Sequence, residues 1–298
     1  MTATLPEESG ASVGIAEQVQ QIPLSRLRPF EGHPFKVQDD DAMAETVESI
    51  KQIGVVVPLI ARPMEDGSLE IIAGHRRHHA AQLAGLESVP VLVREMDRDA
   101  AVIFMVDSNL QRENILPSEK AWAYRMKIDA IDRIKGRPQK ECQVGTDYFG
   151  KRTMEIVGED GGDSARQVDR YVRLTNLIPE IMDMVDSREI SFNPAVELSY
   201  LKPEEQKDFL SAMDYAQAAP SLSQAQRMKK MSQEGSCDLD AMCEVMNEVK
   251  KSDMGRVSFS TDSLKRFFPK SYTPKQMEDT ILRLLEQWQR KRQRDMER

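Results

Sequence analysis

The feature that most constrains the fold is a change of periodicity near Asp99. Before it, short β-branched runs alternate with helical stretches. After it, strand signals nearly disappear and apolar residues recur at helical spacing. With 298 residues the chain exceeds the usual size of one compact core, so we expect several domains. The predicted fold class is α+β and mostly helical, with a small α/β N-terminal domain, an all-α middle domain and a helical C-terminal region.

The domain boundaries follow from the same pattern. Residues 1–20 mix Thr, Pro, Glu, Ser and Gly without a period, which predicts a flexible tail. We assign the α/β domain to residues 21–112, the helical domain to 113–215, and a linker with the C-terminal region to 216–298.

Turn and cap residues mark the expected elements of the α/β domain. In chain order we predict a short strand and turn at 22–27, a helix capped by Asp39–Asp41 and ended by Gly54, a strand over Val55–Arg62, a hairpin turn at Asp66-Gly67, a strand over Leu69–Ile72, a helix over Gly74–Leu83, and a strand over Val89–Val93.

Helical spacing and cap residues mark most of the later elements. We predict helices over Ala100–Leu110, Ser118–Ile134 with Ser118 as the cap, Thr153–Val157, Ser164–Leu177, Glu180–Asp186, Pro194–Leu201, Pro203–Met213, Leu222–Ser232 and Asp238–Val249, then a strand at Val257–Phe259 and a final helix from Pro274.

Composition narrows the class of protein. No apolar run has the length of a membrane span and the N-terminus lacks a signal core, so we expect a cytoplasmic protein without a membrane partner. Three irregularly spaced cysteines, Cys142, Cys237 and Cys243, predict free thiols. The net charge of −8 argues against a polyanion partner, but arginines concentrate in three places, and local charge decides DNA binding. These places are Arg76–Arg77, Arg166–Arg173 and Arg290–Arg294.

The first arginine cluster is a candidate phosphate site. Gly74 stands where a strand becomes a helix, and Arg76 and Arg77 follow it. A helix N-terminus offers unpaired N–H groups, and arginine adds charged donors. A surface arginine pair at a helix start is the alternative. His75 and His79 share a helical face but have no acidic third ligand nearby, so we expect solvated or phosphate-facing imidazoles.

A second polar cluster follows the first helix after Asp99. It contains Asn109, Gln111, Arg112 and Glu113. Taken alone, these residues suit a helix cap or a solvated face.

The segment Thr153–Leu174 has the pattern of a helix-turn-helix, with a first helix that ends near Gly158 and Ser164 as cap of the second. Arg and Gln can make bidentate contacts with guanine and adenine edges. We therefore assign base reading to Arg166, Gln167 and Arg170, and phosphate contacts to Ser164 and Arg173. An amphipathic helix with solvated arginines is the alternative.

The C-terminal helix carries an apolar stripe. Thr273 is its expected cap, and the stripe predicts either a homodimer contact or docking onto its own domain. The basic run Arg290–Arg294 suits non-specific DNA contact or a solvated helix end. The stripe comprises Met277, Ile281, Leu284, Leu285 and Trp288.

Three ordered boxes resemble the N-terminal domain of ParB/RepB partition proteins. They are GVVVPLIAR from Gly54, EIIAGHRRHHAAQLAGLESVPV from Glu70 and NLQRENILPSEKAWAY from Asn109. The family patterns are GxxQP, GERRxxA and ENxQRExLxPxExA. With the helix-turn-helix, the resemblance covers residues 20–215.

The resemblance implies a clamp that binds CTP and Mg²⁺ in the N-terminal domain and closes around DNA. By position, Gly74, Arg76 and Arg77 would hold phosphates and Gly54–Pro58 would border the base. Asn109 would lie beside the metal, and Gln111 and Arg112 would complete the pocket. His75 and Glu113 belong to the same candidate set.

The chain departs from the family boxes at three positions. His75 and Ser108 stand where the family has Glu, and Val57 where it has Gln. Because lost carboxylates weaken magnesium coordination, we expect nucleotide binding with slow or absent hydrolysis.

The resulting hypothesis is a partition protein that binds a centromere-like site in double-stranded DNA during plasmid or chromosome segregation, located on the nucleoid or plasmid. The family implies a ParA-type ATPase as partner and a homodimer. A ParB-like transcriptional or nucleoid-occlusion regulator is the nearest alternative. A phosphotransferase or nucleotide hydrolase is the alternative of another class, but a sulfiredoxin-like site needs a cysteine where Gly74 stands.

Overall fold

The computed structural model describes residues 18–112, 114–136 and 152–248, and then 267–268, 272–273, 276–277, 280–285 and 287. Contacts divide the chain into one unit over Met1–Met246 and a second over Asn247–Arg298. The domain boundaries at 112 and 215 stay predictions. The features predicted at Glu113, Cys142, Val257–Phe259, Trp288 and Arg290–Arg294 lie outside the described residues.

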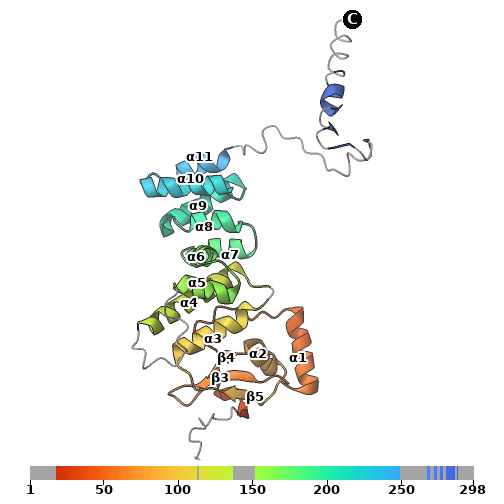
Figure 1. The fold of residues 1–298 in the computed structure, drawn as a ribbon, viewed down its shortest axis with the longest axis vertical. Helices are drawn as coiled ribbons and strands as arrows, with labels where there is room; N and C mark the ends of the chain where they lie inside the picture. The colour runs from red at the N-terminus through yellow and green to blue at the C-terminus, as the bar shows by residue number, and fades with distance from the viewer. Residues whose placement is uncertain are drawn as a thin grey trace, which may run out of the picture. The chain divides into compact units, whose positions relative to one another are not determined.

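Within the described residues, five short strands form one sheet near the N-terminus (Figure 1). The spatial order is β1-β5-β3-β4-β2. The pairs β1–β5 and β3–β4 are antiparallel, and the pairs β3–β5 and β2–β4 are parallel. The strands are β1 (Val19–Pro23), β2 (Leu27–Arg28), β3 (Leu59–Pro63), β4 (Leu69–Ala73) and β5 (Ser88–Val93), with a 3₁₀ turn at Leu24–Arg26.

Two cores lie on opposite faces of this sheet because strand side chains alternate. Ile71 belongs to the core formed with α1 (Asp41–Ile53) and α2 (His75–Leu83). Its neighbour Ile72 belongs to a second core shared with α3 (Arg98–Leu110) and α4 (Pro117–Lys135). The α/β part is thus joined to the helical part through the packing of α3 on α4.

The later helices build on α4. The second core continues into α5 (Thr153–Gly161) and α6 (Ala165–Leu174). A third core holds the remaining helices together, and Ala225 and Met228 place α10 in that core. These helices are α7 (Pro179–Asp186), α8 (Phe192–Leu198), α9 (Pro203–Ala216), α10 (Leu222–Glu234) and α11 (Leu239–Asn247).

The mostly helical α+β class is confirmed, and several predicted ends are corrected. β3 begins at Leu59, because Val55–Pro58 forms a connection in which Val56 and Val57 are exposed. α5 continues past Gly158 to Gly161, and α6 ends at Leu174. Ser118 does not cap α4, which begins at Pro117 with Leu116 as its N-cap.

In the second unit, Gln276–Met277, Thr280–Leu285 and Gln287 are helical. Thr273 is at the start as predicted, and its hydroxyl accepts the Gln276 N–H at 3.4 Å. Leu282, Leu284 and Leu285 are exposed. Homodimer contact through this helix stays a prediction. None of the helices in the described part of the chain has both the length and the apolar character of a membrane span.

Candidate functional site

The turn between β4 and α2 requires glycine. Gly74 has φ 102° and is the N-cap of α2. A Cβ at this position would lie 3.0 Å from Leu59 Cγ, so a side chain would strain the backbone and also collide with β3. The predicted strand-glycine-helix turn is therefore present, and it brings the start of α2 against the start of β3.

Two arginines on α2 connect this turn to neighbouring segments. Arg77 donates to the carbonyl oxygens of Val57 and Pro58, the latter at 2.7 Å. Arg76 pairs with Asp40, at 3.2 Å between Nη2 and Oδ1. Arg77 thus holds Pro58 near the start of α2, and the phosphate-binding role of Gly74, Arg76 and Arg77 stays a prediction.

Gly54 ends α1 with φ 72°, four residues before Pro58. It therefore lies at the start of the connection that Arg77 holds. Asp40, expected only as a helix cap, has a second contact, with Arg76.

Two of the three histidines of α2, His75 and His78, are buried rather than solvated, and a phosphate-facing role for them stays a prediction. His75 is buried, its Nε2 accepts the Phe30 N–H at 3.3 Å, and its ring lies on that of His33 with centroids 3.8 Å apart. Burial lowers the pKa of His75 to about 3, so the imidazole is neutral. His78 is also buried. His79 alone of the three is near an acid, with Nε2 2.8 Å from Asp39 Oδ1.

The end of α3 supplies the second predicted cluster. Asn109 is buried and its amide donates to the Met105 carbonyl at 2.8 Å, while the Ser108 hydroxyl donates to the same carbonyl at 2.9 Å. Gln111 is the C-cap of α3 and is exposed.

Arg112 follows Gln111 and lies over the Phe35 ring at 5.7 Å. Desolvation lowers the pKa of the Arg112 guanidinium, and the nearby charge of Arg76 lowers it further against the opposing effect of Glu119. The charges of Arg76 on α2 and Arg112 after α3 therefore repel one another, and the carboxylate of Glu119 has the larger effect on Arg112.

The donor set at the end of α3 does not fit a dedicated magnesium site. Mg²⁺ in proteins takes carboxylate oxygens together with substrate phosphates. Near Asn109 the described residues offer the Asn109 amide oxygen and the Ser108 hydroxyl, and neither is a carboxylate. In the described chain no group of three His, Cys, Asp or Glu side chains is placed to hold a metal.

Helices α5 and α6 carry the candidate nucleic-acid residues. Ser164 caps α6 as predicted, and its hydroxyl accepts the Gln167 N–H at 3.2 Å. Val168 is buried, and the Tyr171 ring lies 5.9 Å from that of Tyr124 and 4.8 Å from that of Phe192. The apolar face of α6 is therefore packed inward.

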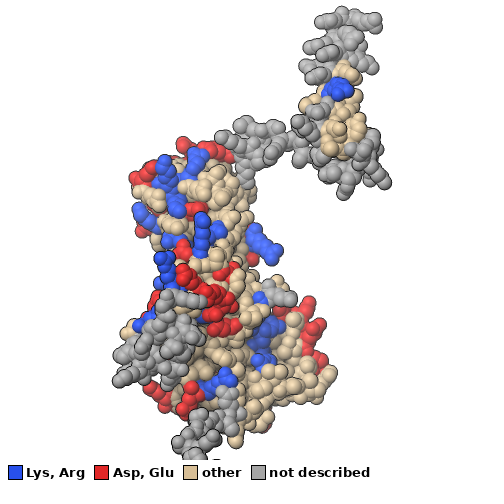
Figure 2. Space-filling model, in the orientation of Figure 1, with Lys and Arg blue, Asp and Glu red and all other residues tan. Residues whose placement is uncertain are grey.

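Two arginines of α6, Arg170 and Arg173, contact neutral side chains. Arg170 donates to the side-chain oxygens of Gln167 and Asn193 and lies over the Phe192 ring at 5.0 Å. Among the described residues, Arg166, Arg170 and Arg173 have no carboxylate partner. Lys and Arg side chains lie over the helices from α6 to α10 in Figure 2.

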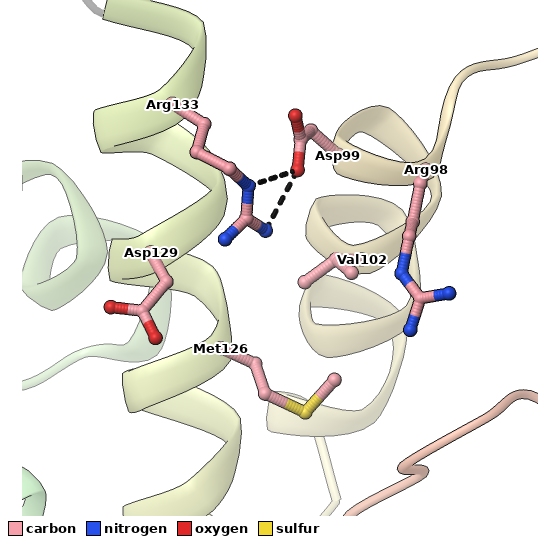
Figure 3. Close-up of a pocket in the computed structure, with 6 residues that line it drawn as sticks. All are labelled: Arg98, Asp99, Val102, Met126, Asp129 and Arg133. Carbon is pink, nitrogen blue, oxygen red and sulfur yellow. Dashed lines mark hydrogen bonds and ion pairs between the residues drawn. The ribbon is translucent and has the colours of Figure 1, made fainter.

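A shallow cavity of about 420 Å³ between α3 and α4 was not predicted (Figure 3). Arg133 reaches across it to Asp99, at 2.8 Å. Arg98 pairs with Glu31 at 2.9 Å and Asp129 with Arg125 at 3.4 Å. Because these charges are already paired within the protein, the cavity presents no free cation or nucleophile to a ligand. No motif marks its lining.

Comparison with known proteins gives one family match. Residues 9–110 match the ParB N-terminal domain. Chromosome-partitioning protein Spo0J of Thermus thermophilus is 33% identical over 63% of this chain and 62% of its own length. The nucleoid occlusion protein of Listeria monocytogenes is 29% identical over 64% of this chain and 61% of its own length. The chain thus spans less than two thirds of these relatives.

Solved structures of the C-terminally truncated chromosome-partitioning protein ParB from Caulobacter crescentus are also similar. The complex with the centromeric parS site has a TM-score of 0.43 and 22% identity, and covers 71% of this chain and 98% of that one. The complex with CTP-γ-S has a TM-score of 0.31 and 27% identity, and covers 61% of this chain and 92% of that one.

Proposed function

This chain belongs to the ParB family, and on that basis we propose that it is a site-specific DNA-binding protein of plasmid or chromosome partition. It binds a centromere-like site in double-stranded DNA through a helix-turn-helix formed by α5 and α6. The observation that carries this proposal is the row of α6 arginines, which have no carboxylate partner among the described residues. Cations that no carboxylate neutralises favour a polyanion on that face.

Residues near the start of α6 are the base readers. The early part of a recognition helix meets base edges in the major groove, and Arg and Gln make bidentate contacts there. Arg166, Gln167 and Arg170 take this role, and the hydrogen bonds of Arg170 to Gln167 and Asn193 hold its guanidinium in one orientation. Ser164 and Arg173 contact phosphates.

The substitution Arg170→Ala tests the base-reading role. We expect a loss of about 1 to 3 kcal/mol on the selected site and little loss on random duplex DNA, measured by fluorescence anisotropy. Arg125→Ala is the matched control, because Arg125 is exposed on α4 and paired only with Asp129. Equal losses on both duplexes would remove Arg170 from the base readers.

The N-terminal domain binds a nucleoside triphosphate, with CTP as the nucleotide that the family boxes indicate. The start of α2 and the cations Arg76 and Arg112 hold the phosphates, and a phosphate takes the place of Asp40 on Arg76. His75, Asn109, Gln111 and Glu113 complete the candidate set. Mg²⁺ binds only together with the nucleotide phosphates. Hydrolysis of the nucleotide is slow or absent because Ser108 and His75 supply no carboxylate.

Calorimetry with CTP, ATP, GTP and UTP tests nucleotide binding. We expect CTP to bind in the presence of the selected DNA, and Arg76→Ala to weaken it. No binding of any of the four nucleotides would contradict the proposal.

The same family membership leads us to propose a homodimer and a ParA-type ATPase as partners, and location on the nucleoid or plasmid. Light scattering of the full chain measures the first, and stimulation of a cognate ATPase measures the second. A monomer at micromolar concentration would contradict the dimer.

A nucleoid-occlusion or transcriptional regulator is a second candidate, favoured by the similarity to the Listeria protein. Mapping of the binding sites in the genome, together with a plasmid segregation assay, separates the two. Loss of the gene that leaves segregation unchanged would favour the regulator.

A further inference from the structure

One aromatic ring near the end of α8 lies between two cations from other helices. Tyr200 is partly exposed, and Arg173 Cζ of α6 lies 3.6 Å from its ring centroid. Lys229 Nζ of α10 lies 3.5 Å from the same centroid. Groups so close to a centroid must lie above or below the ring plane. Two groups at these distances would overlap on one face of the ring, so one cation lies on each face of Tyr200.

The charges of this cluster are not balanced. Lys229 pairs with Glu197 at 2.8 Å, whereas Arg173 has no carboxylate partner among the described residues. The Nε of Arg173 is buried and has no hydrogen-bond acceptor among the described residues. The cluster of Arg173, Tyr200 and Lys229 therefore carries an excess positive charge, which is a property of an anion-binding site.

The position of the cluster indicates the source of the anion. Arg166, Arg170 and Arg173 are spaced by four and three residues, so they share one face of α6. A polyanion that lies along that face and passes Arg170 next meets Arg173, and with it Tyr200 and Lys229. Tyr200 holds both side chains in place, which reduces the entropy lost when they bind a phosphate.

We propose that Arg173, Tyr200 and Lys229 form a clamp for one phosphate of the DNA backbone, so that α10 is part of the DNA-binding surface. This inference rests on the proposed function and extends it beyond the helix-turn-helix. It assigns a ligand-binding role to a helix whose sequence showed no DNA-binding signal.

The test is anisotropy with the full chain on the selected duplex and on a random duplex, over a range of salt. Lys229→Gln should weaken binding about three- to tenfold on both duplexes and lower the salt slope by about one. Lys230→Gln is the matched control, because Lys230 is exposed and pairs only with Glu234 of its own helix at 3.7 Å. Tyr200→Leu should show the same loss as Lys229→Gln, and Tyr200→Phe should retain binding.

Circular dichroism establishes that the variants are folded. One combination of results would contradict the clamp: wild-type chain binds DNA and Arg170→Ala loses specific binding, but Lys229→Gln binds both duplexes as tightly as Lys230→Gln. Wild-type chain that binds neither duplex contradicts the proposed function and the clamp together.

Discussion

At the scale of single residues, Gly74 shows why the turn between β4 and α2 favours glycine. Its φ of 102° is a conformation that L side chains rarely adopt, and Leu59 occupies the space a Cβ would need. Gly85 has φ 74° and open space around the same position. A comparison of alanine substitutions at the two glycines therefore separates the energetic cost of backbone strain from the cost of steric contact.

We expect Gly74→Ala to lower the free energy of unfolding by about 2 to 3 kcal/mol and Gly85→Ala by about 1 kcal/mol. The larger loss for Gly74→Ala arises from the contact of the new Cβ with Leu59 and from the displacement of Arg77. Urea denaturation of both variants measures it. Equal losses would show that Leu59 and Arg77 adjust without cost.

His75 makes stability depend on pH. Its pKa is about 3 in the folded chain and about 6.5 when unfolded, mainly because of burial. Below pH 6.5 the unfolded chain binds a proton that the folded chain does not. The stability contributed by this neutral imidazole is thus complete above pH 6.5 and is lost as the pH falls toward 3.

For a single proton the slope is about 1.4 kcal/mol per pH unit. Between pH 7 and pH 5, wild-type chain should lose about 2 kcal/mol more of its unfolding free energy than His75→Gln. Burial also lowers the pKa values of His33 and His78, so the variant keeps some dependence. Urea denaturation at the two pH values tests this, and parallel losses would contradict a buried neutral His75.

At the scale of elements, Lys127 fixes three helices. It is fully buried in α4, and its ammonium donates to Asp107 of α3 and Asp160 of α5. Burial raises the pKa of Asp107 against the opposing effect of Lys127. This ion-pair cluster connects α3, whose last turn contains Asn109, with the first helix of the proposed helix-turn-helix.

Lys127→Met should lower the free energy of unfolding by about 3 kcal/mol, because it leaves two carboxylates without their cation. The value is at the low end for buried pairs because both carboxylates keep access to water, with side chains 41% and 44% exposed. Lys230→Met, at an exposed pair, should cost less than about 0.5 kcal/mol. Chemical denaturation compares the two, and losses of similar size would contradict the buried role.

Caps and propensities that are local in sequence predicted most elements. They failed where contacts with residues distant in sequence determine the local structure. Asp40 caps α1 and Ser164 caps α6, as their positions indicated. Ser118 looked like a cap of α4, but its N–H and hydroxyl donate to Asp186, which is 68 residues away. The valines before Pro58 have strand propensity, yet Val56 and Val57 are exposed because Arg77 holds the carbonyls of Val57 and Pro58 in a turn.

The candidate site residues stay a prediction, but their environments can be compared with the sequence. The family boxes put Gly74 and Arg77 in one site with the Pro58 segment, and Arg77 does contact that segment. It could not show that His75 packs on His33 and Phe30, because that contact depends on the path of the chain before α1. Tyr200 and Lys229 have no motif, and only folding brings them to Arg173.

At the scale of the whole molecule, the net charge of −8 does not describe the surface that we propose to bind DNA. Acidic side chains pair with many of the cations, as Asp40 does with Arg76, but among the described residues none pairs with the arginines of α6. We therefore expect specific contacts to provide the affinity for DNA, since the overall charge repels phosphates.

The most direct test is selection of duplexes from a random DNA library by the full chain, with and without CTP. The double variant R166A/R170A is selected in parallel. We expect one enriched sequence for wild-type chain, a change in retention with CTP, and no enriched sequence for the variant. Absence of any enriched sequence, or the same sequence from the variant, would contradict DNA recognition by α6.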